Sequence, residues 1–203
     1  MRRIALLAVA ASSLWAGADD VSAQSLVPKQ VVLQEYGACM VRQAPGRSKA
    51  LLATELGTKD EAELGRQVAM AVAPCLKGRW GLSMQTGAIR GAAAEAMFAR
   101  DPQLLDRLAA LPPAPAQRPA VADGRAFVIA YSSCLEQASP SATATLLRTA
   151  ITSEQERAAF LGYGDVLKDC MPVGQRYSVN ITDIRNHVAA IAYRRLVGRT
   201  GAQ

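Results

Sequence analysis

Four cysteines at two equal spacings constrain this chain more than any other feature of its sequence. Cys39 and Cys75 recur as Cys134 and Cys170 after an offset of 95 residues. With this offset, residues 36–100 align with residues 131–195 without a gap and with 13 identities in 65 positions. A repeat of this kind predicts a tandem duplication, here of a unit of about 65 residues. The repeated positions include Tyr36/Tyr131, Pro45/Pro140, Leu51/Leu146, Leu52/Leu147, Thr54/Thr149, Glu61/Glu156, Ile89/Ile184, Arg90/Arg185 and Arg100/Arg195.

Four cysteines permit three disulfide pairings, and the duplication favours Cys39–Cys75 with Cys134–Cys170, one bridge per unit. Each bridge would close a loop of 37 residues, counting both cysteines, and would stabilise the fold by about 4 kcal/mol through loop-closure entropy. The alternative is redox or metal chemistry. The chain has no C-x-x-C motif, and a zinc site with four thiolates needs close pairs of cysteines. We therefore expect structural disulfides, and neither a metal nor a cofactor.

Residues 1–23 have the pattern of a secretory signal peptide. Arg2 and Arg3 precede a largely apolar stretch at residues 4–18, and Val21-Ser22-Ala23 provides small residues for cleavage before Gln24. The alternative is a membrane anchor, which needs about 20 apolar residues, and two aspartates end this stretch earlier. We expect export to the periplasm or the extracellular space and no transmembrane segment in the mature chain.

Apolar spacing predicts that both units are helical. Val32, Tyr36 and Cys39 are separated by four and three residues, and the same steps recur in the second unit from Phe127. This spacing places the three side chains on one face of a helix. A proline then ends the helix in each unit, at Pro45 and Pro140.

Two capping boxes predict where a later helix begins in each unit. Thr58-x-x-Glu61 and Ser153-x-x-Glu156 place a hydroxyl and a carboxylate where each can bond a backbone N–H at a helix start. A last helix carries Ile89 in the first unit and Ile184 in the second. Small residues at 91–94 would let another helix approach this one closely.

These patterns predict an all-α protein with about four short helices in each unit. The expected organisation is a signal peptide at 1–23, helical unit 1 at 24–100, a helix end and Pro-rich linker at 101–125, and helical unit 2 at 126–203. The linker carries four prolines between residues 112 and 119, which favour extended backbone over helix or sheet.

Two arginines recur next to an isoleucine, Arg90 and Arg185, near the start of the last helix of each unit. A cation is unfavourable there because the helix dipole is positive at that end. We expect a buried ion pair with Glu61 or Glu156, and the alternative is an anionic ligand. His187, the only histidine, could act as a general base, but we expect a half-exposed helix residue because the repeat places Ala92 at the equivalent position.

Positive charge is concentrated in the first unit. The chain has a net charge of +6, and residues 36–100 carry nine basic against five acidic side chains. A basic patch could contact anionic lipid, lipopolysaccharide or an acidic partner, and the alternative is an ordinary solvated surface. Export argues against a nucleic-acid partner, and no basic stretch is interleaved with aromatics. The candidate patch comprises Arg42, Arg47, Lys49, Lys77 and Arg79.

The runs at 36–42, 75–76 and 89–96, together with Pro45, resemble a group of small exported alphaproteobacterial proteins. The second unit departs from this pattern at residues 186–188. The resemblance implies an exported address and no activity, so no catalytic residue carries over. We expect a non-catalytic binding or envelope-associated module, whose partner is an unknown protein or an anionic envelope component. The alternative is a small periplasmic enzyme with its site between the two units.

Overall fold

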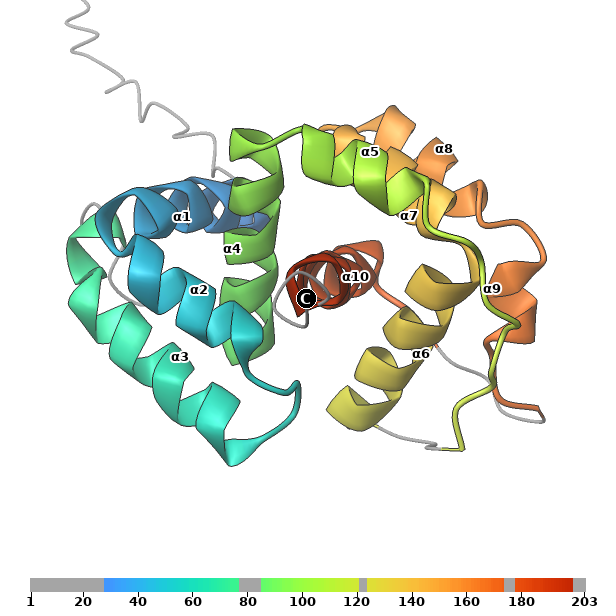
Figure 1. Ribbon diagram of the computed structural model, residues 1–203, viewed down its shortest axis with the longest axis horizontal. Helices are drawn as coiled ribbons and strands as arrows, with labels where there is room; N and C mark the ends of the chain where they lie inside the picture. The colour runs from blue at the N-terminus through green and yellow to red at the C-terminus, as the bar shows by residue number, and fades with distance from the viewer. Residues whose placement is uncertain (1–27, 77–84, 121–123, 174–177, 199–203) are drawn as a thin grey trace, which may run out of the picture.

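The computed structural model describes residues 28–76, 85–120, 124–173 and 178–198. The predicted signal peptide lies outside these residues. Within them the chain is all-helical, with ten α-helices, one 3-10 helix and no strand (Figure 1). The elements are α1 Lys29–Gln43, α2 Pro45–Ala53, α3 Lys59–Ala71, η1 Ala73–Leu76, α4 Thr86–Arg100, α5 Gln103–Ala109, α6 Gly124–Ala138, α7 Pro140–Arg148, α8 Glu154–Leu161, α9 Val166–Asp169 and α10 Ile181–Gly198.

Helix starts in the two halves of the chain lie at matching positions. Four helices, α1, α2, α3 and α4, begin 95 residues before α6, α7, α8 and α10. Pro45 and Pro140 occupy the first turn of α2 and α7, where the missing N–H of proline costs nothing. The halves differ after α8, where a turn through Gly162 and Gly164 separates α8 from α9.

The two predicted capping boxes are present, with one difference in detail. Thr58 Oγ1 accepts from the backbone N–H of Glu61, and Ser153 Oγ accepts from that of Glu156. Each glutamate carboxylate accepts from the residue before the cap rather than from the cap itself, at 2.8 Å from Gly57 N and 2.7 Å from Thr152 N. Both of these residues have positive φ, 81° and 57°, which turns their N–H groups toward the carboxylates.

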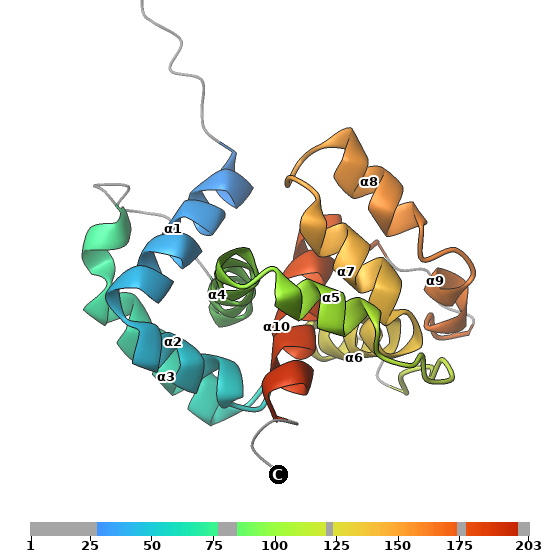
Figure 2. The ribbon, with the colours of Figure 1, turned by 45° about the horizontal axis from the view of Figure 1, so that its top comes forward.

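The centre of the molecule is the crossing of α4 and α10. These helices lie between the group α1–α3 and the group α6–α9 (Figure 1), and Figure 2 shows the same arrangement after a turn of 45°. A Cβ added at Gly91 would lie 2.5 Å from Asn186 Cα, so α10 is the helix that uses the small face at residues 91–94. Phe98 and Tyr193 pack edge to face, with ring centroids 5.9 Å apart. Gly91 and Asn186, like Phe98 and Tyr193, are 95 residues apart in the chain.

The two halves share a hydrophobic core. The larger core cluster joins buried residues of α1–α5 to Leu147 of α7 and to Tyr193 and Leu196 of α10. A second cluster lies within α6–α10 and includes Phe127, Tyr131 and both cysteines of the second disulfide. The two halves are therefore packed against each other and are not separate domains joined by a linker.

The segment 101–125, expected as a helix end and linker, contains the separate helix α5. Asp101 ends α4 with φ −134° and ψ 83°, so α5 does not prolong it. Leu104, Leu105 and Leu108 are buried, and α5 packs against α7 (Figure 2). The proline-rich part is also tied down, since Ala114 N donates to the carbonyl of Gln137 at 2.8 Å.

Substituting Gly91 tests the helix crossing. Gly91→Ala is expected to lower the free energy of unfolding by about 2 kcal/mol, because the added methyl must displace the backbone of α10. The matched control is Gly46→Ala in α2, where a Cβ would meet nothing within 4 Å. The control should be neutral or gain up to about 1 kcal/mol from helix propensity. Urea unfolding followed by circular dichroism measures both, and equal effects at the two positions would contradict the close crossing.

Candidate functional site

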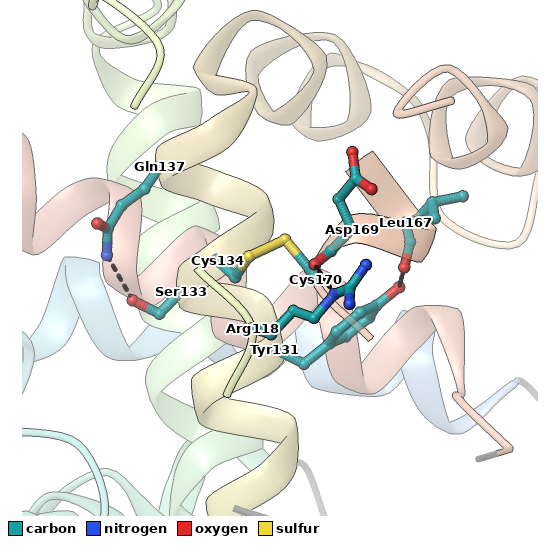
Figure 3. Close-up of a disulfide and its surroundings, with 8 residues drawn as sticks. All are labelled: Arg118, Tyr131, Ser133, Cys134, Gln137, Leu167, Asp169 and Cys170. Carbon is teal, nitrogen blue, oxygen red and sulfur yellow. Dashed lines mark hydrogen bonds between the residues drawn. A yellow bond between two sulfur atoms is a disulfide. The ribbon is translucent and has the colours of Figure 1, made fainter. Parts of the chain in front are cut away.

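Both expected disulfides are present and leave no free cysteine. Cys39 is bonded to Cys75 and Cys134 to Cys170, with Cα–Cα distances of 5.7 Å in each pair. Figure 3 shows the second bridge joining α6 to the residue after α9. Beside it, Tyr131 Oη donates to the carbonyl of Leu167 at 3.2 Å. The pairing is the one expected from the sequence, with one bridge in each half of the chain.

Arg90 lies in the expected buried ion pair with Glu61, and Glu61 has a second cationic partner that was not expected. Its Nη1 is 3.5 Å from Glu61 Oε1, and both side chains are fully buried. Its Nη2 donates to the carbonyls of Leu52 and Thr54. The other oxygen of Glu61 accepts from Arg125 at 2.7 Å. Arg125 belongs to α6, so the first half's carboxylate is shared with an arginine of the second half.

Arg185 has the reverse arrangement, in which one guanidinium serves two carboxylates. It pairs with Glu156 at 3.1 Å, as expected. It also forms two 2.9 Å bonds to Glu95 of α4, through Nε and Nη2. Its remaining donors reach Leu146 and Thr149. Each expected pair thus recruits a third charge from the opposite half of the chain.

The alignment of the two halves did not predict that Glu95 and Arg125 take part in these ion pairs. Glu95 aligns with Ala190, and Arg125 aligns with Gln30, so neither is a repeated residue. Arg195 was visible as a repeated arginine, aligned with Arg100. It pairs with the buried Glu136 at 3.0 Å.

His187 is buried, with 8% of its surface exposed, which corrects the expectation of a half-exposed residue. The reason is that α6 and the start of α4 cover this part of α10, and a Cβ on Gly87 would lie 3.1 Å from His187 Nε2. His187 Nδ1 is 2.7 Å from the carbonyl of Asp183. Because a carbonyl only accepts, Nδ1 carries the proton of the neutral ring. His187 Nε2 has no hydrogen-bond partner.

This burial predicts that stability falls in mild acid. Burial lowers the pKa of His187, the bond to Asp183 opposes this effect, and the charge of Arg125 lowers the pKa further. The unfolded chain, with a histidine pKa of about 6.5, therefore binds a proton that the folded protein resists. The contribution of His187 to the free energy of unfolding is therefore fully present above a pH of about 6.5 and decreases as the pH falls below this value. We expect a loss of about 1 kcal/mol between pH 7.5 and pH 5.5 that His187→Gln does not share, measured by urea unfolding. Equal losses in the two proteins would contradict this role.

The candidate basic patch is described only in part. Arg42, Arg47 and Lys49 are exposed, at the end of α1 and on α2. Lys77 and Arg79 lie outside the described residues. The described part of the candidate patch therefore consists of these three exposed cations.

Two grooves of similar size lie between the halves. The first, of about 580 Å³, runs between α6, α10 and the loop after α2, and we call it the α6–α10 groove. The second, of about 560 Å³, lies against α1, α4, α5 and the end of α7, and we call it the α1–α4 groove. They use positions 95 residues apart, namely Gln34/Ile129, Ala38/Ser133, Ala96/Ile191, Ala99/Arg194 and Ala150/Glu55.

The α6–α10 groove has polar and apolar walls. Leu56, Ile129 and Ile191 are partly buried along it. Arg194 is exposed, and within the described residues it has no carboxylate partner. The polar lining residues are Glu55, Ser133, Glu136, Gln137, Arg194 and Arg195.

Glu136 is the most unusual group of the α6–α10 groove. Its side chain is fully buried. Burial raises its pKa, and the attraction and hydrogen bond of Arg195 oppose this effect. One carboxylate oxygen accepts from Arg195, and the other, Oε2, has no hydrogen-bond partner. A buried unpaired oxygen is costly, and this oxygen is itself inaccessible, so it belongs to the wall of the groove.

No family model, curated protein or solved structure matches the chain. Among residues 28–76, 85–120, 124–173 and 178–198, no three His, Cys, Asp or Glu side chains gather as a metal site. No helix in that part of the chain is long and apolar enough to cross a bilayer. An assignment of function therefore depends on the geometry of the grooves and on the sequence patterns.

Proposed function

We propose that this protein is an exported, non-catalytic binding module whose ligand occupies the α6–α10 groove. The observation that carries this proposal is the groove itself, in which three apolar side chains and an exposed Arg194, which has no carboxylate partner among the described residues, border one amphipathic space. Concave sites with apolar walls and a few polar groups are typical of ligand binding. The predicted signal peptide and the two disulfides support an exported address.

We further propose that the module arose by tandem duplication, as the cysteine spacing suggests. Matching helix starts support this origin. So do the contacts between equivalent residues, Gly91 with Asn186 and Phe98 with Tyr193. Contacts between equivalent positions are the property of a two-fold interface, so the arrangement is that of a dimer whose two copies became joined. Membership of the exported alphaproteobacterial group remains part of this proposal.

The enzyme alternative would place its chemistry between the halves and would need a base oriented by an acidic group. His187 lies outside the α6–α10 groove, in a smaller space of about 190 Å³ beside Arg125 and Asp183. Its Nδ1 bonds a backbone carbonyl and its Nε2 has no partner. This geometry favours binding over turnover.

Native mass spectrometry of the protein purified from its host periplasm tests the proposal. Ser133→Trp should fill the α6–α10 groove, and Thr145→Trp places the same side chain at an exposed position on α7. The wild type and Thr145→Trp are expected to carry a bound mass that Ser133→Trp lacks, with all three folded by circular dichroism. Bound mass that persists in Ser133→Trp, or a wild type that carries none, would contradict the proposal.

A further inference from the structure

The two recurring arginines are unequally compensated. Arg185 has two carboxylates within 3.1 Å. Arg90 has one, at 3.5 Å, and that carboxylate also serves Arg125. Arg90 Nε, whose counterpart in Arg185 bonds Glu95, has no hydrogen-bond partner. The cluster of Arg90, Arg125 and Glu61 therefore carries one positive charge more than its single carboxylate neutralises.

The missing carboxylate is explained by one substitution between the halves. Glu95, which completes Arg185, aligns with Ala190. Burial lowers the pKa of Arg90 to about 10, Glu61 only partly opposes this effect, and Arg194 lowers the pKa further by repulsion. Arg90 and Arg194 thus form a positive region without the second carboxylate found in the other half.

This positive region lies directly behind the α6–α10 groove. Arg90 donates to both oxygens of Thr54, and the next two residues, Glu55 and Leu56, line the groove. Arg194 lines the groove itself and is exposed. An incoming group would meet Arg194 first, with the field of Arg90 behind it.

Building on the proposed binding function, we propose that the ligand of the α6–α10 groove is an amphipathic anion. Its acidic head binds Arg194 and supplies the negative charge that Glu95 supplies on the other side of the molecule. Its apolar body lies along Leu56, Ile129 and Ile191. A carboxylate and a phosphate monoester share this chemistry.

Of the two acidic residues that line the groove, only Glu55 limits the affinity for an anion. Glu136 is already paired with Arg195, so this pair adds no net charge. Glu55 is exposed at the groove and opposes an anion. Removing the charge of Glu55 should therefore strengthen binding, which is a result that a general loss of structure cannot produce.

The test is a titration of oxidised, ¹⁵N-labelled residues 24–203 with four probes. Octanoate and octyl phosphate carry an acidic head, octylamine carries a cationic head on the same tail, and inorganic phosphate has no tail. Octanoate or octyl phosphate is expected to shift amides of α6 and α10, with octylamine and inorganic phosphate at least tenfold weaker. The stronger of the two acidic probes identifies the head group. Binding should weaken with salt because an exposed charge carries it.

Four variants separate the ligand class from the fold. Arg194→Gln should weaken binding about tenfold, as expected for the loss of a charge-assisted hydrogen bond, while Arg194→Lys keeps most of it. Glu55→Gln should tighten binding about threefold, and Arg157→Gln on α8 should change nothing. Equal binding of octylamine, or an unchanged Arg194→Gln, would overturn the anion proposal. The groove's binding role would still stand if a bound mass depends on Ser133, so the two proposals can fail separately.

Discussion

Arg185→Met is expected to lower the free energy of unfolding by about 3–5 kcal/mol. Arg185 is 2% exposed, and its removal leaves Glu95 and Glu156 without their shared cation in a buried setting. Breaking a buried pair by removing one partner costs this much because the remaining charge is uncompensated. The substitution also removes donors from the carbonyls of Leu146 and Thr149. Urea unfolding at pH 7.5 measures the loss.

Two control variants make this prediction specific. Arg148→Gln breaks an exposed ion pair with Asp106, and such pairs contribute about 0–1 kcal/mol. Arg90→Met should cost less than Arg185→Met, because Glu61 keeps its 2.7 Å contact with Arg125. If Arg185→Met and Arg148→Gln were equally mild, the ion pairs of Arg185 with Glu95 and Glu156 would not hold the two halves together.

Removing one disulfide is the second large effect that the structure predicts. Replacing Cys134 and Cys170 with alanine opens a loop whose ends are 36 residues apart in sequence, and loop-closure entropy puts the loss at about 4 kcal/mol. We expect the pair Cys39 and Cys75 to give a similar loss, because its sequence separation is the same. Removing both bridges should leave no cooperative unfolding transition, since a domain is typically stable by only about 5–15 kcal/mol.

The shared core predicts that the two halves unfold in one transition even after one disulfide is removed. Because Leu147 and Tyr193 of the second half belong to the larger core cluster, loss of one bridge should weaken the whole protein. Circular dichroism should then follow a single transition at lower urea concentration. Two separate transitions would mean that the halves unfold independently, contrary to the packing of α4 on α10.

The local structure of this protein was largely predictable from its sequence. Prolines at the first turns of α2 and α7, and hydroxyl residues before α3 and α8, act within a few residues, so their effects are visible in the sequence. The helical class was expected from apolar spacing, and the two disulfides were expected from the equal spacing of the cysteines. A helical first part of residues 101–125 was expected as the end of the preceding helix, whereas α5 is a separate helix whose residues Leu104, Leu105 and Leu108 are buried.

The contacts between the halves could not be predicted, because the residues that form them do not match across the offset of 95 residues. Glu95 and Arg125 act across the molecule, and their aligned residues, Ala190 and Gln30, lack charge. The burial of His187 follows from the same packing. The candidate groove depends on differences between the halves, such as Arg194 in place of Ala99, and only the fold shows that these residues face one space.

A peptide map under non-reducing conditions, on protein recovered from its native host, tests whether this chain is an exported protein whose two halves are each closed by a disulfide. We expect a mature N-terminus at Gln24 and the crosslinked pairs Cys39–Cys75 and Cys134–Cys170. An uncleaved start, free thiols, or a bridge between the two halves would contradict this expectation.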